Sequence, residues 1–209
     1  MVYIILICIA VPVLLLMTLL DNRSRLLTGF MLLGMVIAVS AYEINSTIQL
    51  AFLMSAQEIS VRAAPVVEEI LKALPVLLFA SVISDQRKIV LPLSMAVGIG
   101  FAILENTFLL ITYIDQVSLG WAVIRGISTS LSHGMCTLTV GYGMTFIHKQ
   151  KKLFYTGIFG LLSLAMTFHA VFNLLIQSRY DYIGMMLPIC LYLLFWLIRF
   201  ITEKKKKEI

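Results

Sequence analysis

Side chains suited to hydrolytic chemistry or metal binding occur in three hydrophobic stretches of this chain. The first holds two carboxylates and an amine, the second a carboxylate and an amide, and the third an imidazole and an amide: Glu68, Glu69 and Lys72, then Glu105 and Asn106, then His169 and Asn173. Carboxylates and imidazoles act as general acids and bases and as metal ligands. A charged residue at the centre of a membrane helix costs roughly 2.5 to 3.5 kcal/mol on insertion scales, so these residues indicate a function.

The spacing within each stretch places the polar groups on one helix face. Glu68 and Lys72 are four residues apart and Glu69 and Lys72 are three apart, so the ammonium can neutralise one carboxylate and leave the other to react. His169 and Asn173 are one helical turn apart, which lets an imidazole and an amide address the same bound group. The pattern predicts one anchored and one reactive acid in the first stretch.

Taken singly, each of these residues has an ordinary structural explanation. A lone intramembrane carboxylate is typical of an ion or proton pathway, and a lone histidine can be a buried, hydrogen-bonded residue. Arg125 follows Trp121 by four residues, so we expect its side chain to extend toward lipid headgroups, with contact to a substrate or oxyanion as the alternative. Only the combination of these residues indicates catalysis.

The composition identifies the class of protein in which these residues occur. Of the 209 residues, 60% are hydrophobic and 13% are charged, and the mean hydropathy is +0.98. These values exclude a conventional soluble domain and indicate a single integral membrane domain over residues 1–209. The three cysteines show no CxxC spacing, so they predict neither a disulfide framework nor a structural zinc site.

Continuous apolar runs of about 20 residues predict an all-α, polytopic membrane protein rather than a barrel of alternating strands. We expect about seven transmembrane helices, at residues 2–20, 27–45, 65–84, 89–113, 121–147, 154–176 and 182–201. Residues 46–64 are too polar for a span but contain the apolar run IQLAFLM. This segment is expected to be an interfacial or re-entrant piece that can cover a site.

The positions of lysine and arginine predict the orientation. Basic residues fall in alternate connections, namely Arg23 and Arg25, Arg87 and Lys88, Lys149 with Lys151 and Lys152, and Lys204 to Lys207. Because positive charge stays preferentially in the cytoplasm, the N-terminus is predicted outside and the basic tail 202–209 inside. The net charge of +5 therefore reflects topology and indicates no nucleic-acid partner.

The predicted depths of the polar residues agree across helices. At about 1.5 Å per residue, Glu69, Glu105 and His169 lie roughly 6 to 12 Å from the outer ends of their spans, and His133 lies at roughly 18 Å. Ordinary helix tilt brings His133 within reach of the others. Glycines near these residues allow close helix packing, at Gly98, Gly100, Gly126, Gly134, Gly141 and Gly143. We therefore expect one site in the outer half of a four-helix core.

The ordered set of motifs resembles a known family. The segments EEILK (68–72), FAILEN (101–106), SLSHG around His133 and HAVFN (169–173) are similar to the PrsW family of bacterial intramembrane proteases, which is related to the CAAX prenyl endopeptidases and to bacteriocin-processing or immunity proteins. The resemblance covers about residues 65–176. Glu105, where the prenyl endopeptidases usually have histidine, and Arg125, eight residues before His133, favour the PrsW branch. The first two spans and the last are matched only by hydrophobicity.

The resemblance implies an intramembrane endopeptidase of the bacterial cell membrane that makes the first cut in a membrane-anchored anti-sigma factor, near its extracytoplasmic boundary. The expected catalytic residues are Glu68, Glu69, Glu105, His133, His169 and Asn173, supported by Lys72, Asn106 and Arg125. In a metal version, His133 and His169 with Glu69 or Glu105 bind Zn²⁺ and the remaining glutamate is the general base. In a metal-free version, Glu69 takes the proton of water and His169, Asn173 or His133 stabilises the oxyanion.

Two other classes of function compete with proteolysis. A proton- or ion-coupled transporter also uses buried glutamate, lysine and histidine, but it predicts a site near the membrane midplane and often an internal repeat, and the sequence indicates neither. A non-catalytic protein of the same fold, of the bacteriocin-immunity type, is the other alternative. The intact set of glutamates, histidines and asparagine argues against it. The sequence leaves the substrate and the oligomeric state open.

Overall fold

The computed structural model describes residues 1–149 and 151–207, and all regular structure in that part is helical. The long helices are α1 (Val2–Met17), α2 (Asn22–Phe52), α4 (Ala64–Val82), α5 (Arg87–Thr112), α6 (Leu119–Met144), α7 (Lys151–Ile176) and α8 (Asp181–Lys207). Short helical pieces are α3 (Ala56–Glu58), a π-helical turn η1 (Ile59–Ala63) and a 3-10 turn η2 (Ile114–Gln116). The all-α prediction is confirmed for this part. Residues 208–209 of the predicted tail lie outside it.

Within the described residues, four helices are long and apolar enough to cross a membrane by length and composition: α2, α5, α7 and α8. Helix α1 is apolar but has only 16 residues. Helix α4 carries three buried charged residues, Glu68, Glu69 and Lys72, and α6 carries a buried arginine and histidine. These two helices hold five polar residues of the predicted site, and the other four, Glu105, Asn106, His169 and Asn173, lie on α5 and α7.

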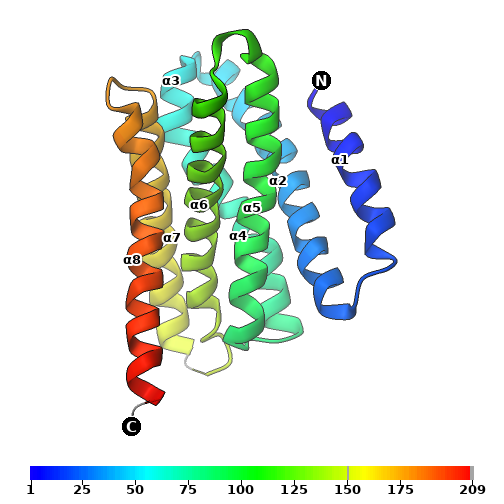
Figure 1. Cartoon of the computed structure of the whole chain (residues 1–209), viewed down its shortest axis with the longest axis vertical. Coiled ribbons are helices and arrows are strands. Elements are labelled where there is room, and N and C mark those ends of the chain that lie inside the picture. Colours follow the sequence, from blue (N-terminus) through cyan, green and yellow to red (C-terminus); the bar gives the residue numbers. More distant parts are fainter. Residues whose placement is uncertain (150, 208–209) are drawn as a thin grey trace.

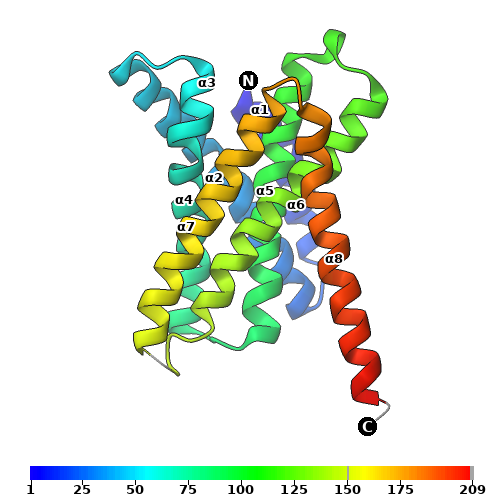
Figure 2. The ribbon, with the colours of Figure 1, turned by 90° about the vertical axis from the view of Figure 1, so that its left-hand side faces the viewer.

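The long helices run alongside one another as a bundle (Figures 1 and 2). Helix α5 packs most extensively against α6 and α2, and α6 also packs against α7 and α8. The N-terminus, α3 and the α5–α6 connection lie at one end, called here the N-terminal end, and the C-terminal part of α8 lies at the other (Figure 1). At that opposite, basic end, Lys149 lies 3.7 Å from Asp85 and the Arg87 guanidinium lies 4.7 Å from the Tyr142 ring.

Two glycines of α5 allow close contacts with neighbouring helices. A Cβ atom on Gly98 would overlap the main chain of His133 and lie 2.7 Å from the Cα of Gly134, and one on Gly100 would overlap the carbonyl of Met31. Because backbone cannot yield as a flexible side chain can, these positions hold α6 and α2 close to α5. The expectation was wrong for Gly126, where an added Cβ would meet nothing within 4 Å.

The segment 46–64 differs from the expectation in its first half. Helix α2 does not end near residue 45 but continues to Phe52, so residues 46–52 are regular helix. The chain then reverses at Leu53, whose φ of 51° is left-handed, and a capping box between Ser55 and Glu58 starts the turn that leads through η1 into α4. Four polar residues of this stretch, Tyr42, Asn45, Ser46 and Gln49, share one helix face, and their polarity made a helical segment look too polar to be a span.

Candidate active site

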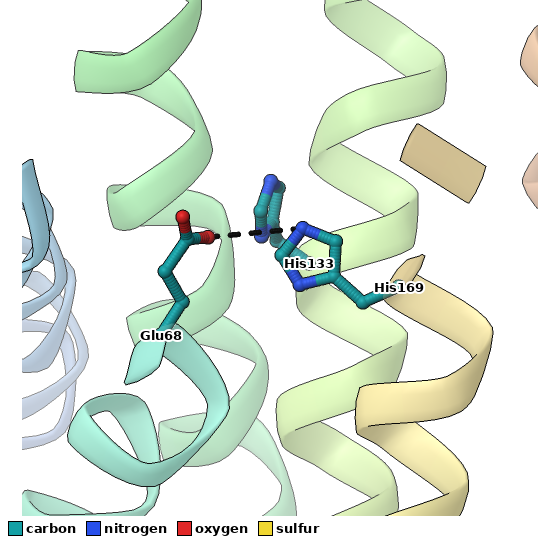
Figure 3. A group of neighbouring side chains, drawn as sticks. All are labelled: Glu68, His133 and His169. Atoms are coloured by element: carbon teal, nitrogen blue, oxygen red, sulfur yellow. Dashed lines mark ion pairs between the residues drawn. The ribbon is translucent and has the colours of Figure 1, made fainter. Parts of the chain in front are cut away.

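Side chains from α4, α5, α6 and α7 meet inside the bundle. Ligand atoms of Glu68, His133 and His169 all lie within 4.8 Å of one another, and all three residues are buried. Figure 3 shows Glu68 and His169 pointing toward each other from α4 and α7, with the His133 ring beside them. Glu68 Oε2 lies 3.7 Å from His169 Nε2, and Glu105 Oε2 lies 2.8 Å from His133 Nε2.

Glu69 is the anchored carboxylate of the pair on α4. Its Oε1 accepts a hydrogen bond from Lys72 Nζ at 2.6 Å and lies 2.9 Å from His169 Nδ1. The side chains of Glu69 and Lys72 are fully buried, so each charge depends on the other for compensation. Glu68 lies one residue earlier and makes no such pair, and its Oε2 has no hydrogen-bond partner among the described residues.

The contact with Glu69 fixes the orientation of His169. A carboxylate can only accept, so His169 Nδ1 carries the proton and donates it to Glu69. The lone pair of His169 then resides on Nε2, which faces Glu68. A histidine held by a carboxylate through one ring nitrogen presents the other as a base or as a metal ligand.

His133 carries its ring proton on the other nitrogen from His169. Lys72 Nζ lies 2.9 Å from His133 Nδ1 and 4.8 Å from the centroid of the Phe101 ring. An ammonium has only donors, so it makes Nδ1 the acceptor and leaves the ring proton on Nε2, the nitrogen nearest Glu105. The two imidazole rings meet edge to face, with centroids 4.7 Å apart. Lys72 therefore contacts both Glu69, which holds His169, and His133, which lies beside Glu105.

The remaining predicted residues have other contacts. Asn173 Nδ2 donates to the carbonyl of Ser60 at 2.9 Å, so this amide ties α7 to η1. Asn106 is buried on α5. Arg125 does not extend to the surface as expected: it is 7% exposed, and its guanidinium lies 5.3 Å from the Trp121 ring. Its charge is close enough to attract that of Glu105.

The comparison with known families gives a match over most of the chain. The protein-family model described as "PrsW family intramembrane metalloprotease" matches residues 22–201 of this chain. The chain belongs to this family. No curated protein and no solved structure gives a match. PrsW membership makes the chain a multi-pass intramembrane protease, and the match runs from α2 to α8, beyond the residues 65–176 that carried the resemblance.

The PrsW description includes a metal, and the residues present fit one. Two imidazoles and one carboxylate form the ligand set of many catalytic zinc sites. Glu68 Oε2 and His169 Nε2 are buried without a hydrogen-bond partner, as free ligand atoms would be. His169 also has the carboxylate on its second nitrogen that zinc-binding histidines usually have. His133 can bind a metal through Nε2 only if its ring proton moves from Nε2 to Nδ1. The Lys72 ammonium, which now lies 2.9 Å from Nδ1, would then have to move away, because both atoms would be donors.

One residue that contacts this cluster, Asn45, was not among the residues predicted from the sequence. Asn45 Nδ2, on α2, donates to Glu68 Oε1 at 3.3 Å, which leaves Oε2 directed at His169. Asn45 lies three residues after Tyr42 and four before Gln49, and Ser46 lines the same face of α2. That periodicity could have revealed a polar face directed inward, but the polarity of residues 46–64 instead predicted an interfacial or re-entrant piece outside the spans.

Proposed function

We propose that this PrsW protein cleaves a membrane-anchored protein near its extracytoplasmic boundary, and that the substrate is an anti-sigma factor of a bacterial stress response. The observation that supports it is the convergence of Glu68, Glu105 and His169 in the half of the bundle nearest its N-terminal end, with His133 beside them near the middle of α6. From the helix ends at that side, Glu68 lies about 6 Å deep, Glu105 and His169 about 10 Å, and His133 about 21 Å. A site at this depth reaches the boundary of a substrate span more readily than its centre.

The proposed orientation has the N-terminal end outside. The basic residues Arg23, Arg87 and Lys149 gather at the opposite end, which the preference for cytoplasmic positive charge assigns to the cytoplasm. In this orientation the N-terminus is extracytoplasmic and the C-terminus is cytoplasmic. The site then opens toward the side on which an extracytoplasmic stress signal arrives.

In the proposed mechanism, Glu68, His133 and His169 would hold a zinc ion. When bound there, the ion would supply Lewis-acid chemistry, namely the activation of water near neutral pH and the polarisation of the peptide carbonyl. Glu105, the remaining carboxylate at the site, is the general base that takes the proton from the attacking water and passes it to the leaving amine. Glu69 acts through His169 by holding its ring, and Lys72 neutralises Glu69.

The contact between Lys72 and His133 favours a second, metal-free mechanism. With its proton on Nε2, His133 is a donor that can stabilise the oxyanion formed when the peptide carbonyl is attacked. Glu68 then takes the proton from water, and His169 Nε2 lies 3.7 Å from it to relay that proton to the leaving amine. Both mechanisms assign Glu68 a direct part in the reaction and Glu69 a positioning part.

The function is tested by comparing new N-termini in the membrane proteome of cells that express the wild type or Glu68→Gln at equal levels. The matched control is Glu43→Gln, which makes the same change at an exposed carboxylate on α2. Termini that occur with wild type and control but not with Glu68→Gln, in single-span proteins near the extracytoplasmic boundary, are expected and would identify the substrate. Identical termini in all three strains under envelope stress would refute proteolysis and favour a carrier or an immunity-type protein.

A further inference from the structure

A cavity of about 220 Å³ opens beside Glu68 and Glu105, between α2, α5 and the start of α4. Most of its wall is apolar, formed by Ala38, Ala41, Phe101, Leu104 and Phe108. The cavity thus begins at the two carboxylates that do not bind Lys72 and extends toward α1 and α2. We refer to it as the α2 cavity.

One edge of the α2 cavity is polar. Tyr42, Asn45, Ser46 and Gln49 line it from a single face of α2. The Asn45 amide can bind two groups at this edge. Its Nδ2 donates to Glu68 Oε1, and its Oδ1 is buried without a hydrogen-bond partner and can accept a further hydrogen bond. Burying an amide oxygen without a hydrogen-bond partner is unfavourable, so the position favours a ligand that brings an N–H group.

We propose that the α2 cavity is the subsite for a large apolar side chain of the substrate next to the scissile bond, and that Asn45 Oδ1 accepts a backbone N–H of the same substrate segment. This inference rests on the proposed proteolytic function. Asn45 would then join the substrate backbone to Glu68, so that the scissile carbonyl lies beside the reacting carboxylate.

The size and charge of the α2 cavity select the side chain. A protein cavity of about 150 Å³ accepts a benzene ring, so one of about 220 Å³ has room for leucine, methionine or phenylalanine. The adjacent carboxylates Glu68 and Glu105 disfavour an acidic side chain by charge repulsion. Residues at the edge of a transmembrane span supply large apolar side chains, which agrees with a cut near the substrate's membrane boundary.

The test uses purified full-length protein in proteoliposomes with a library of single-span peptides randomised over the residues at one boundary of the span. Cleaved products are sequenced by mass spectrometry. For the wild type we expect a preference of about tenfold or more in kcat/KM for leucine, methionine or phenylalanine over alanine at one position beside the cut. Ala41→Leu fills the α2 cavity and should reverse that preference in favour of alanine or glycine.

The matched control is Ser40→Leu, which adds a leucine at the neighbouring exposed position of the same helix and should keep the wild-type preference. Ala38→Leu fills the cavity from one turn away and replaces Ala41→Leu if that variant fails to fold. Asn45→Ala should lower kcat for every library sequence without altering the preference.

The outcomes separate the two proposals. A wild type that cuts no library member refutes the proteolytic function itself. Cleavage without a preference at any position, or a preference that both cavity-filling variants retain, refutes the subsite and leaves proteolysis standing.

Discussion

The buried pair formed by Glu69 and Lys72 yields a quantitative prediction about stability. Two unit charges 2.6 Å apart attract each other by about 6 kcal/mol at an effective dielectric constant near 20, before the cost of desolvation is subtracted. Glu69→Gln would leave the fully buried Lys72 ammonium without its counter-charge, a change that typically costs about 3 to 5 kcal/mol. Lys72→Met in addition removes the orphaned charge and should restore most of the lost stability.

Cys136 provides the assay for this prediction. Its thiol is 3% exposed and lies 3.6 Å from the carbonyl of Ala165, whereas Cys8 and Cys190 are exposed. In a background with both exposed cysteines changed to serine, a thiol-reactive dye reports unfolding through Cys136 alone. For a chain of this length, a loss of 3 to 5 kcal/mol lowers Tm by roughly 6 to 20 °C.

Glu68→Gln is the internal comparison, since Glu68 makes no bond to Lys72 and its Oε2 has no hydrogen-bond partner. It should leave Tm close to the wild-type value while abolishing cleavage. The reasoning is refuted if Glu69→Gln melts like the wild type, or if Lys72→Met fails to rescue it, because Lys72 would then not depend on Glu69 for its charge.

Three further predictions concern packing, the η1 segment and metal. Gly98→Ala should lower both Tm and activity because its Cβ would overlap the His133 main chain, while Gly126→Ala should match the wild type in the same assays. Asn173→Ala removes the bond to Ser60 and should speed hydrogen exchange across residues 59–63; unchanged exchange would contradict the proposed tie between α7 and η1. Purified protein should contain about one zinc ion per chain, and His169→Ala should lose it; full activity without zinc would eliminate the zinc mechanism.

The helices were largely predictable because lipid-spanning segments need long apolar runs. The predicted spans 154–176 and 182–201 fall within α7 and α8, with starts and ends that differ by at most six residues. The main difference is in α2, which extends to Phe52. Its polar residues at 45, 46 and 49 lie toward the α2 cavity, and hydropathy averaged over all faces cannot distinguish such a helix from an exposed polar segment.

The residues that face the site were predictable in part. Spacing indicated that Lys72 neutralises one of two adjacent acids, but Glu68 and Glu69 are both within one turn of it, so spacing could not identify which. Rotation of about 100° per residue directs Glu69 toward Lys72 and His169 and leaves Glu68 toward Asn45. Arg125 was expected at the surface because only its position relative to Trp121 was available, whereas its burial depends on the neighbouring helices.

The different roles of Glu68 and Glu69 follow from the charges around them. The cluster contains three carboxylates, while the cations close to them are Lys72 and Arg125, so with both imidazoles neutral it carries one excess negative charge in a buried place. Lys72 offsets Glu69, and Arg125 attracts Glu105. Glu68 is the acid left without a cation, and a buried unpaired carboxylate favours a bound cation or a transferred proton. The lack of a nearby cation makes the Glu68 carboxylate costly to bury. For the same reason, this carboxylate favours binding zinc or accepting a proton from water.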